Sequence, residues 1–216
     1  LPIVSALYPD ATAVWANNQA EVTAPGLKLC IKPEAKYIVA NGRYLYVPDG
    51  VKVDGAHILV PVRTLCQALG ATVTWDDATS TITIAAGSGP IASGDSFYNS
   101  TDLYWLSRII YAESGNQSLE GKIAVGNVVL NRVASSLFPN SVYDVIFQRN
   151  QFTPASSGSI NRVPSEDAVI AAKLCLDGAN TADNALYFVN PKASPNSWAS
   201  RNCTYVATIG AHAFFA

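Results

Sequence analysis

The hydrophobic pattern of this chain changes character at a short segment rich in Gly and Pro. Residues 87–95 hold three glycines and one proline and show no apolar period. Before this segment, apolar and polar residues alternate in short runs, which is typical of β-strands, and after it the apolar residues recur at helical spacing. We therefore predict an α+β protein with two domains, residues 1–86 and 99–216, joined by a linker at 87–98.

Two dipeptides suited to tight turns organise the first half. Asn41-Gly42 and Asp54-Gly55 both tolerate the positive φ angles of a type I′ turn. Each lies between short apolar runs, 37–40 with 44–47 and 51–53 with 57–60. These two regions are therefore predicted to be β-hairpins.

One helix interrupts the strands of the first half. From Pro61 onward the apolar residues fall at i, i+3, i+4 and i+7, and Gly70 follows the last of them. Alternation then returns at 72–75 and 81–85, around the turn Asp76-Asp77. The first half is thus predicted to be a small mixed α/β domain.

The second half is predicted to be mainly helical. Its apolar spacing indicates helices at 102–113, 118–134, 142–147 and 164–178. The runs 185–189 and 204–215 are strand-like or irregular. We therefore expect a helical domain with a minor β element.

Glu113 is the position most informative about chemistry. It continues the apolar stripe of the predicted helix instead of joining its polar face, and Gly115 follows closely. A carboxyl group in that place is partly removed from water, which raises its pKa and makes it a usable general acid near neutral pH. The alternative is an ordinary last-turn Glu that points to water or bonds to a neighbouring helix.

Composition and charge exclude several classes of protein. Hydrophobic residues make up 49% of the chain, enough for a core, and charged residues only 14%, so the chain is not intrinsically disordered. The net charge of −2 is spread evenly over both halves, which argues against a nucleic-acid partner. No run approaches the 18 or so apolar residues of a membrane span. We expect a monomer without membrane insertion.

The cysteines indicate an exported protein. Cys30, Cys66, Cys175 and Cys203 show no C-x-x-C spacing, so neither a zinc motif nor a redox motif is indicated. Their even division between the halves predicts disulfides Cys30–Cys66 and Cys175–Cys203, hence secretion. The two histidines are too few and too far apart for a metal site, and we expect no cofactor.

The start of the chain fits this expectation. The sequence contains no Met and begins with Leu1-Pro2. We expect that an N-terminal segment has been lost, either as a cleaved signal peptide or by trimming of the sequence. Secretion is the localisation that these features predict.

The second half contains a series of motifs in one order. They are Tyr111 to Val125, Asn127 to Val133, Gln151-Phe152-Thr153, Tyr187 to Pro191, Trp198, and Ile209 to His212. This series resembles the spore cortex-lytic, cell wall hydrolase family, and the resemblance covers about residues 102–215.

This resemblance implies a lysozyme-like fold and a catalytic role for Glu113. Such enzymes cut the β-1,4 bond between MurNAc and GlcNAc in peptidoglycan, so the resemblance implies a location at the cell wall or the spore cortex. Many members have a second acid just after the Gly, where this chain has Asn116. Glycoside hydrolysis ordinarily needs two carboxyl groups, so one Glu suffices only if the substrate supplies the nucleophile. The C6 hydroxyl of MurNAc can do so, which points to a lytic transglycosylase that forms a 1,6-anhydro end.

The other residues of the match are candidates for binding glycan strands. The resemblance suggests that polar groups in loops bond to sugar and N-acetyl groups, and that aromatic rings stack on sugars. The candidates are Gln151, Phe152, Thr153, Tyr187, Phe188, Asn190 and Trp198. Each could instead be a core or turn residue. Asn131 and Arg132 are expected to tie their helix to neighbouring loops, and His212 to be structural.

The first half also contains a set of recognisable segments, at 51–55, 58–63, 69–76 and 80–84. Together they resemble the copper amine oxidase N-terminal domain. The name implies no copper here, because the first half has no His-rich ligand set, and we expect a role in attachment to the wall. Two other functions stay open for the whole chain: a peptide-cleaving N-acetylmuramoyl-L-alanine amidase, and a wall-binding protein without catalysis.

Overall fold

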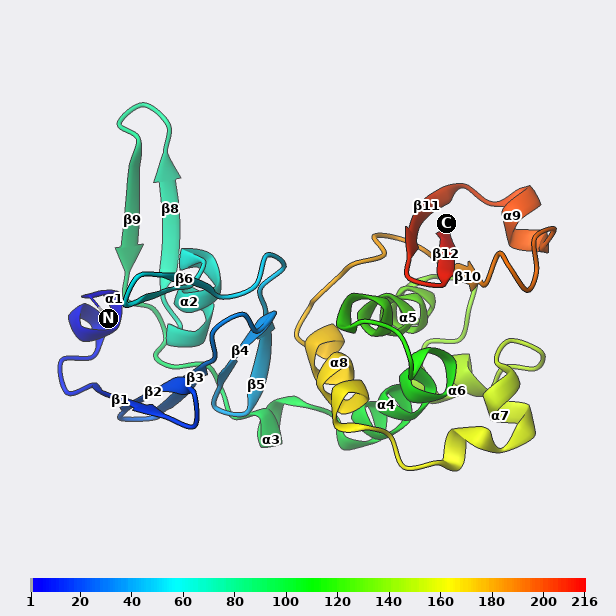
Figure 1. The fold of residues 1–216 in the computed structure, drawn as a ribbon, viewed down its shortest axis with the longest axis horizontal. Coiled ribbons are helices and arrows are strands. Elements are labelled where there is room, and N and C mark those ends of the chain that lie inside the picture. Colours follow the sequence, from blue (N-terminus) through cyan, green and yellow to red (C-terminus); the bar gives the residue numbers. More distant parts are fainter. Residues whose placement is uncertain (1) are drawn as a thin grey trace. The chain divides into compact units, whose positions relative to one another are not determined.

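The computed structural model describes residues 2–216 and divides the chain into two compact units (Figure 1). Unit 1 ends at Phe97, and unit 2 runs from Tyr98 to Ala216. Unit 1 is rich in strands, and unit 2 is mainly helical with one small sheet. The predicted α+β class is confirmed.

Unit 1 is built around a five-stranded antiparallel sheet in which each strand pairs with the next along the chain. Its strands are β1 (Thr12–Ala16), β2 (Gln19–Ala24), β3 (Leu27–Ile31), β4 (Tyr37–Ala40) and β5 (Arg43–Tyr46). Two separate hairpins follow, β6 (Lys52–Asp54) with β7 (His57–Leu59), and β8 (Thr72–Asp76) with β9 (Thr81–Ala85). The helices are α1 (Pro2–Leu7), α2 (Val62–Leu69) and α3 (Gly94–Phe97).

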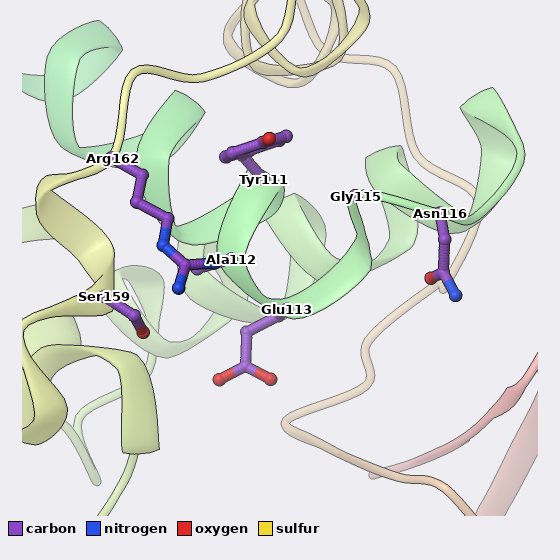
Figure 2. Close-up of a pocket in the computed structure, with 7 residues that line it drawn as sticks. All are labelled: Tyr111, Ala112, Glu113, Gly115, Asn116, Ser159 and Arg162. Atoms are coloured by element: carbon purple, nitrogen blue, oxygen red, sulfur yellow. The ribbon is translucent and has the colours of Figure 1, made fainter.

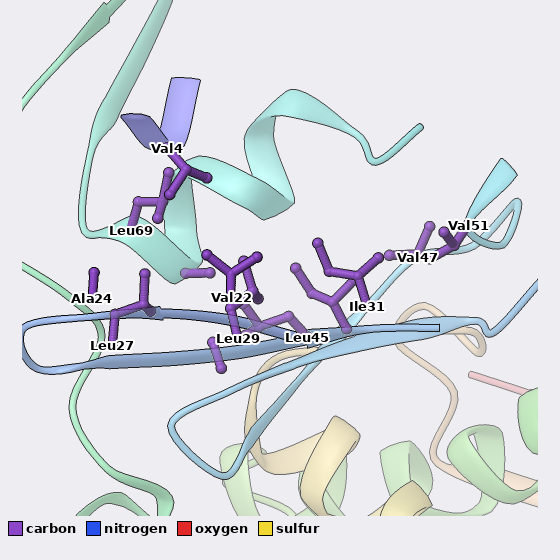
Figure 3. Close-up of a cluster of buried hydrophobic side chains, with 13 residues drawn as sticks. Val4, Val22, Ala24, Leu27, Leu29, Ile31, Leu45, Val47, Val51 and Leu69 are labelled. Carbon is purple, nitrogen blue, oxygen red and sulfur yellow. The ribbon is translucent and has the colours of Figure 1, made fainter. Parts of the chain in front are cut away.

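The core of unit 1 lies between one face of this sheet and the helices α1 and α2. Figure 3 shows Val4 of α1 and Leu69 of α2 facing side chains that rise from the sheet, among them Val22 and Ile31. Alternation along the strands buries every second residue on this face. The sequence pattern therefore specifies which side of the sheet the helices cover.

One of the two predicted hairpin turns has the expected geometry. Asn41 and Gly42 join β4 to β5 with φ angles of 50° and 78°, as a type I′ turn requires. The prediction for Asp54-Gly55 is wrong by one residue, because Asp54 pairs with His57 and the loop is Gly55-Ala56. Only Gly55 of that loop has a positive φ angle, which is the pattern of a type II′ turn.

The Gly-rich segment 87–95 belongs to unit 1 and packs closely against its other elements. A Cβ atom on Gly87 would lie 2.1 Å from the carbonyl oxygen of Gly70, so only glycine fits there. Further along, the Ile91 N–H donates to the Ala68 carbonyl oxygen at 3.2 Å, and the Gly94 N–H donates to the Asn41 carbonyl oxygen at 2.8 Å. These glycines thus permit a close approach of two backbone segments.

Unit 2 contains three longer helices, several short ones and a three-stranded sheet. The longer helices are α4 (Ser100–Ser114), α5 (Leu119–Ala134) and α8 (Glu166–Leu176). The shorter elements are α6 (Val142–Phe147), α7 (Thr153–Ser157), the 3-10 turn η1 (Ser159–Asn161) and α9 (Trp198–Asn202). The sheet has the order β10 (Tyr187–Val189), β12 (His212–Phe215) and β11 (Tyr205–Ile209), all antiparallel. All four predicted helices are present.

Side-chain caps explain where the longer helices begin. The Asn99 side chain accepts hydrogen bonds from the N–H groups of Thr101 and Asp102, at 2.9 and 3.1 Å. Ser118 and Ser165 cap α5 and α8 in the same way. Such caps satisfy N–H groups that have no partner within the helix.

A glycine lets α5 approach its neighbours closely. A Cβ atom on Gly126 would lie 2.6 Å from the Cys175 sulfur of α8 and 2.9 Å from the Ile110 Cδ1 of α4. The three longer helices pack against one another around this point. This packing holds α4, the helix that carries Glu113, against the core of unit 2.

The prediction of two disulfides is wrong for this structure, in which all four cysteines are free thiols. In unit 1, Cys30 alternates with the buried Leu29 and Ile31, so its side chain points away from the face that α2 covers, and Cys66 lies on α2. In unit 2, the Cys175 thiol donates to the Ile123 carbonyl oxygen at 3.4 Å.

The last cysteine lies in another part of unit 2. Cys203 follows α9 and packs against the small cluster that Ala199, Ala213 and Phe215 form. The even cysteine count therefore did not reflect spatial proximity.

Across residues 2–216, none of the helices combines the length and the apolar character that crossing a bilayer requires.

Candidate active site

Glu113 lies in the last turn of α4 and lines an open pocket of about 370 Å³. Figure 2 shows its carboxyl group pointing into the space between the α4 end and the segment that carries Ser159. Burial raises the pKa of this carboxyl above the ordinary 4.5. Within residues 2–216, no hydrogen bond or ion pair reaches it. The sequence pattern correctly predicted a partly desolvated acid.

Two segments form the walls of this pocket. The end of α4 and the residues after it supply Tyr111, Ala112, Glu113, Gly115 and Asn116, and the η1 region supplies Ser159 and Arg162. Glu113 is the only carboxyl group among these seven lining residues. Ser159 and Arg162 were not among the predicted site residues, because their segment shows no periodic pattern or motif.

The loop after Glu113 is held from two sides through Gln117. The Gln117 side-chain oxygen accepts a hydrogen bond from the Ala211 N–H at 2.9 Å. The Lys122 ammonium donates to the Gln117 carbonyl oxygen at 2.6 Å. The turn between β11 and β12 is thereby fixed against the loop that carries Asn116.

The polar residues of α5 anchor the chain that leads into β10. The Asn131 amide donates to the carbonyl oxygens of Asp183 and Ala185, at 2.9 and 3.0 Å. The Arg132 Nε donates to the Leu186 carbonyl oxygen at 2.7 Å. The prediction that Asn131 and Arg132 tie their helix to neighbouring segments is confirmed.

Arg132 is also the centre of an aromatic cluster. Its guanidinium carbon lies 4.8 to 5.4 Å from the ring centroids of Phe138, Phe152 and Tyr187. Burial lowers the pKa of Arg132 to about 10, and its interaction with Tyr187 opposes this decrease. Cation–π contacts of this kind stabilise a buried guanidinium.

The predicted glycan-binding aromatics differ in exposure. Trp198 is 58% exposed and packs edge-to-face on Tyr187, with ring centroids 5.4 Å apart. Phe152 is only 5% exposed and packs near Phe188, so it is a core residue and the predicted sugar contact is not available to it. Trp198 keeps a ring surface that a sugar could reach.

The remaining candidates lie outside the pocket of Glu113. Gln151 and Thr153 are exposed at the start of α7. The Asn190 side-chain oxygen accepts hydrogen bonds from the N–H groups of Lys192 and Ala193, so it stabilises a turn. None of the predicted glycan-binding residues is among the seven that line the pocket.

His212 is buried beside Phe188, with ring centroids 5.2 Å apart. Burial lowers the pKa of this imidazole. Its Nδ1 atom is buried and has no hydrogen-bond partner within residues 2–216. Among residues 2–216 as a whole, no three His, Cys, Asp or Glu side chains are grouped so that they could hold a metal ion.

Comparison with known proteins agrees with this description. Residues 116–215 match the family described as Cell Wall Hydrolase, a match that begins just after Glu113. The catalytic domain of the Bacillus cereus SleB protein superimposes with a TM-score of 0.52 at 34% identity, over 55% of this chain and 92% of that domain. The chain belongs to the cell wall hydrolase family. Residues 3–89 match the copper amine oxidase N-terminal domain, so both family resemblances are confirmed.

Other members of the cell wall hydrolase family are similar over the same region. The catalytic domain of a germination-specific lytic transglycosylase, SleB from Bacillus anthracis, is 33% identical with a TM-score of 0.52, over 58% of this chain and all of that domain. The spore cortex-lytic enzymes of Bacillus cereus and Bacillus subtilis are 35% and 34% identical over 117 residues, 54% of this chain. The chain spans only 45% and 38% of their lengths.

Proposed function

We propose that unit 2 cleaves the β-1,4 bond between MurNAc and GlcNAc in peptidoglycan, as a lytic transglycosylase with Glu113 as its acid and base. The observation that carries this proposal is a single carboxyl group, partly desolvated, in an open pocket with no second carboxyl in its walls. A hydrolase of the ordinary kind needs two such groups. The similar lytic transglycosylase from Bacillus anthracis supports the same reaction class.

The chemistry follows from the protonation of Glu113. Its burial keeps the carboxyl protonated to higher pH than usual, so it can give a proton to the leaving glycosidic oxygen. The resulting carboxylate then accepts the proton of the MurNAc C6 hydroxyl as that oxygen attacks C1. The attack closes a 1,6-anhydro ring, and Glu113 ends the cycle protonated again.

Unit 1 is proposed to attach the enzyme to the wall, outside the cell or in the spore cortex. Figure 1 shows the β8–β9 hairpin extending from the rest of unit 1. On this hairpin Trp75 and Ile82 pair across the strands and are 49% and 51% exposed. An exposed aromatic residue beside an aliphatic one is a surface on which sugar rings can stack.

The test of catalysis is the substitution Glu113→Gln with Glu166→Gln as the matched control. The Gln side chain keeps the shape of Glu113 but has no proton to transfer, so cleavage of purified peptidoglycan should fall by roughly 100-fold or more. Glu166 is exposed in the first turn of α8, and its variant should keep wild-type activity. If Glu113→Gln retains more than about a tenth of the activity, Glu113 is not the general acid.

The same assay addresses the two other functions. An N-acetylmuramoyl-L-alanine amidase would release stem peptides and leave the glycan strands intact. A wall-binding protein without catalysis would bind the sacculus and release nothing. Either result with the wild-type protein would refute the proposed reaction.

A further inference from the structure

Arg162 shares the pocket of Glu113 and is free to bind a ligand. It follows the η1 turn, where its N–H donates to the Ser159 carbonyl oxygen at 3.3 Å. Figure 2 shows its side chain directed toward the α4 wall of the pocket. Within residues 2–216, its guanidinium forms no hydrogen bond or ion pair. It is the only cation among the residues that line this pocket.

Arg162 and Glu113 line one pocket without forming an ion pair. A cation within about 4 to 6 Å of a carboxyl lowers the pKa of that carboxyl. The pKa of Glu113 is instead raised, by burial alone. The pocket thus offers a carboxyl group with a raised pKa at one place and an unpaired positive charge at another.

A ligand that complements this arrangement has a neutral oxygen to be protonated and an anionic group beside it. A guanidinium binds a carboxylate through two parallel hydrogen bonds, which gives both affinity and orientation. The Ser159 hydroxyl lines the same wall and can donate one more hydrogen bond. Muramic acid units carry such a group, either the carboxylate of an unsubstituted lactyl ether or the carboxylates of a stem peptide.

We infer that Arg162, with Ser159, forms a carboxylate-binding subsite beside Glu113 that selects muramic acid units with an anionic substituent. This inference rests on the proposed function, because it takes the glycan strand as the ligand of the pocket. The subsite determines which sugar unit lies next to Glu113, and the proton transfers remain those of Glu113.

A binding measurement in the inactive Glu113→Gln protein tests the subsite without turnover. The ligands are soluble glycan strands in three forms: with stem peptides, with the peptides removed so that lactyl carboxylates are free, and with all carboxyl groups converted to neutral methylamides. Isothermal titration calorimetry compares Glu113→Gln with Glu113→Gln/Arg162→Gln. The exposed Arg63 of unit 1 supplies the matched control, Glu113→Gln/Arg63→Gln.

We expect Arg162→Gln to weaken binding of carboxylate-bearing strands about 10-fold, the effect of losing a charged hydrogen-bonded pair. Binding of the neutral strands should not change, and Arg63→Gln should have no effect on any form. A loss with peptide-free strands identifies the lactyl carboxylate, and a loss confined to peptide-bearing strands identifies the stem peptide. An equal loss on neutral strands, or no loss on any form, overturns the subsite.

Activity of the protein with an intact Glu113 separates this inference from the proposed function. On carboxylate-bearing strands, Arg162→Gln should raise KM with little change in kcat, and Arg162→Lys should recover part of the loss. If the wild-type protein cleaves none of the strands, the proposed function fails, and the binding comparison alone then decides whether the subsite exists.

Discussion

Replacement of Gly210 by Ala is expected to destabilise unit 2 and to lower glycan cleavage, although the residue is remote in sequence from Glu113. Gly210 lies in the β11–β12 turn with a φ angle of +58°, and a Cβ atom on it would lie 2.3 Å from the Gln117 side-chain oxygen. That oxygen accepts the hydrogen bond from the Ala211 N–H at 2.9 Å. The added methyl group must displace the Gln117 side chain and break this bond.

The expected magnitude is the sum of two effects. An L-residue in the left-handed region costs roughly 1 to 2 kcal/mol, and loss of the hydrogen bond costs about 1 kcal/mol. Gly210→Ala should therefore lower the free energy of unfolding by about 2.5 kcal/mol. Gln117→Ala should lower it by about 1 kcal/mol, because it removes this hydrogen bond together with a solvent-exposed one, from the Gln117 amide to the Asn116 side-chain oxygen at 2.9 Å, which contributes little.

The double variant distinguishes this explanation from simple backbone strain. Once Gln117 is Ala, the methyl group of Gly210→Ala meets nothing, and the hydrogen bond is already absent. The double variant should therefore be no less stable than Gly210→Ala alone, about 1 kcal/mol better than the sum of the single changes. Urea unfolding followed by far-UV circular dichroism, to which the helices of unit 2 contribute most, measures these values. Strictly additive effects would refute the proposed contact.

Three further predictions concern the acid, the cysteines and the independence of unit 2. The pKa of Glu113 is raised by burial, so cleavage should decline as pH rises through that pKa. Above that pKa the folded wild type carries a buried charge that Glu113→Gln lacks, so the free energy of unfolding of the variant should rise relative to that of the wild type between acidic and neutral pH. A difference between the two proteins that stays constant across pH would contradict the raised pKa. All four thiols of the unfolded protein should react with a thiol reagent without prior reduction. In the native state Cys175 should react slowest, because burial raises the pKa of its thiol. Fewer than four reactive thiols in the unfolded protein would show that a disulfide forms. A fragment of residues 95–216 should fold and cleave soluble glycan at nearly the rate of the full chain; a folded but inactive fragment, judged by circular dichroism, would show that unit 1 contributes to catalysis.

The helix that carries the acid could be predicted because its pattern is local. Apolar spacing predicted a helix at 102–113, and the structure extends it only to Ser100–Ser114. The same spacing placed Glu113 on the apolar stripe, and the structure shows burial of its carboxyl group. Helix periodicity and burial follow from neighbouring residues, so sequence reasoning works well there.

The opposite wall of the pocket could not be predicted because it depends on tertiary packing. Ser159 and Arg162 follow a short helix in a segment without an apolar period, and only the fold brings this segment against the end of α4. An exposed Arg in such a segment looks like any other surface residue. Its importance is visible only when the neighbours in the pocket are known.

The cysteine pairing and the Gly-rich segment show a second limit. Cysteine counts indicate how many thiols each half holds, but not which face of a strand or helix presents them. A run with several glycines indicates backbone freedom, yet Gly87 is required where the chain passes close to Gly70. A flexible linker and a closely packed backbone segment can both be rich in glycine, so a structure is needed to distinguish them.

The central claim, cleavage of glycan strands with one carboxyl group and no hydrolytic water, is tested most directly by the chemistry of the products. Purified peptidoglycan digested with the wild-type protein and analysed by mass spectrometry should yield muropeptides that end in 1,6-anhydro-MurNAc. These products are lighter by one water than the products of hydrolysis, and they should be absent with Glu113→Gln. Muropeptides with reducing MurNAc ends, or free stem peptides with intact glycan, would contradict the mechanism.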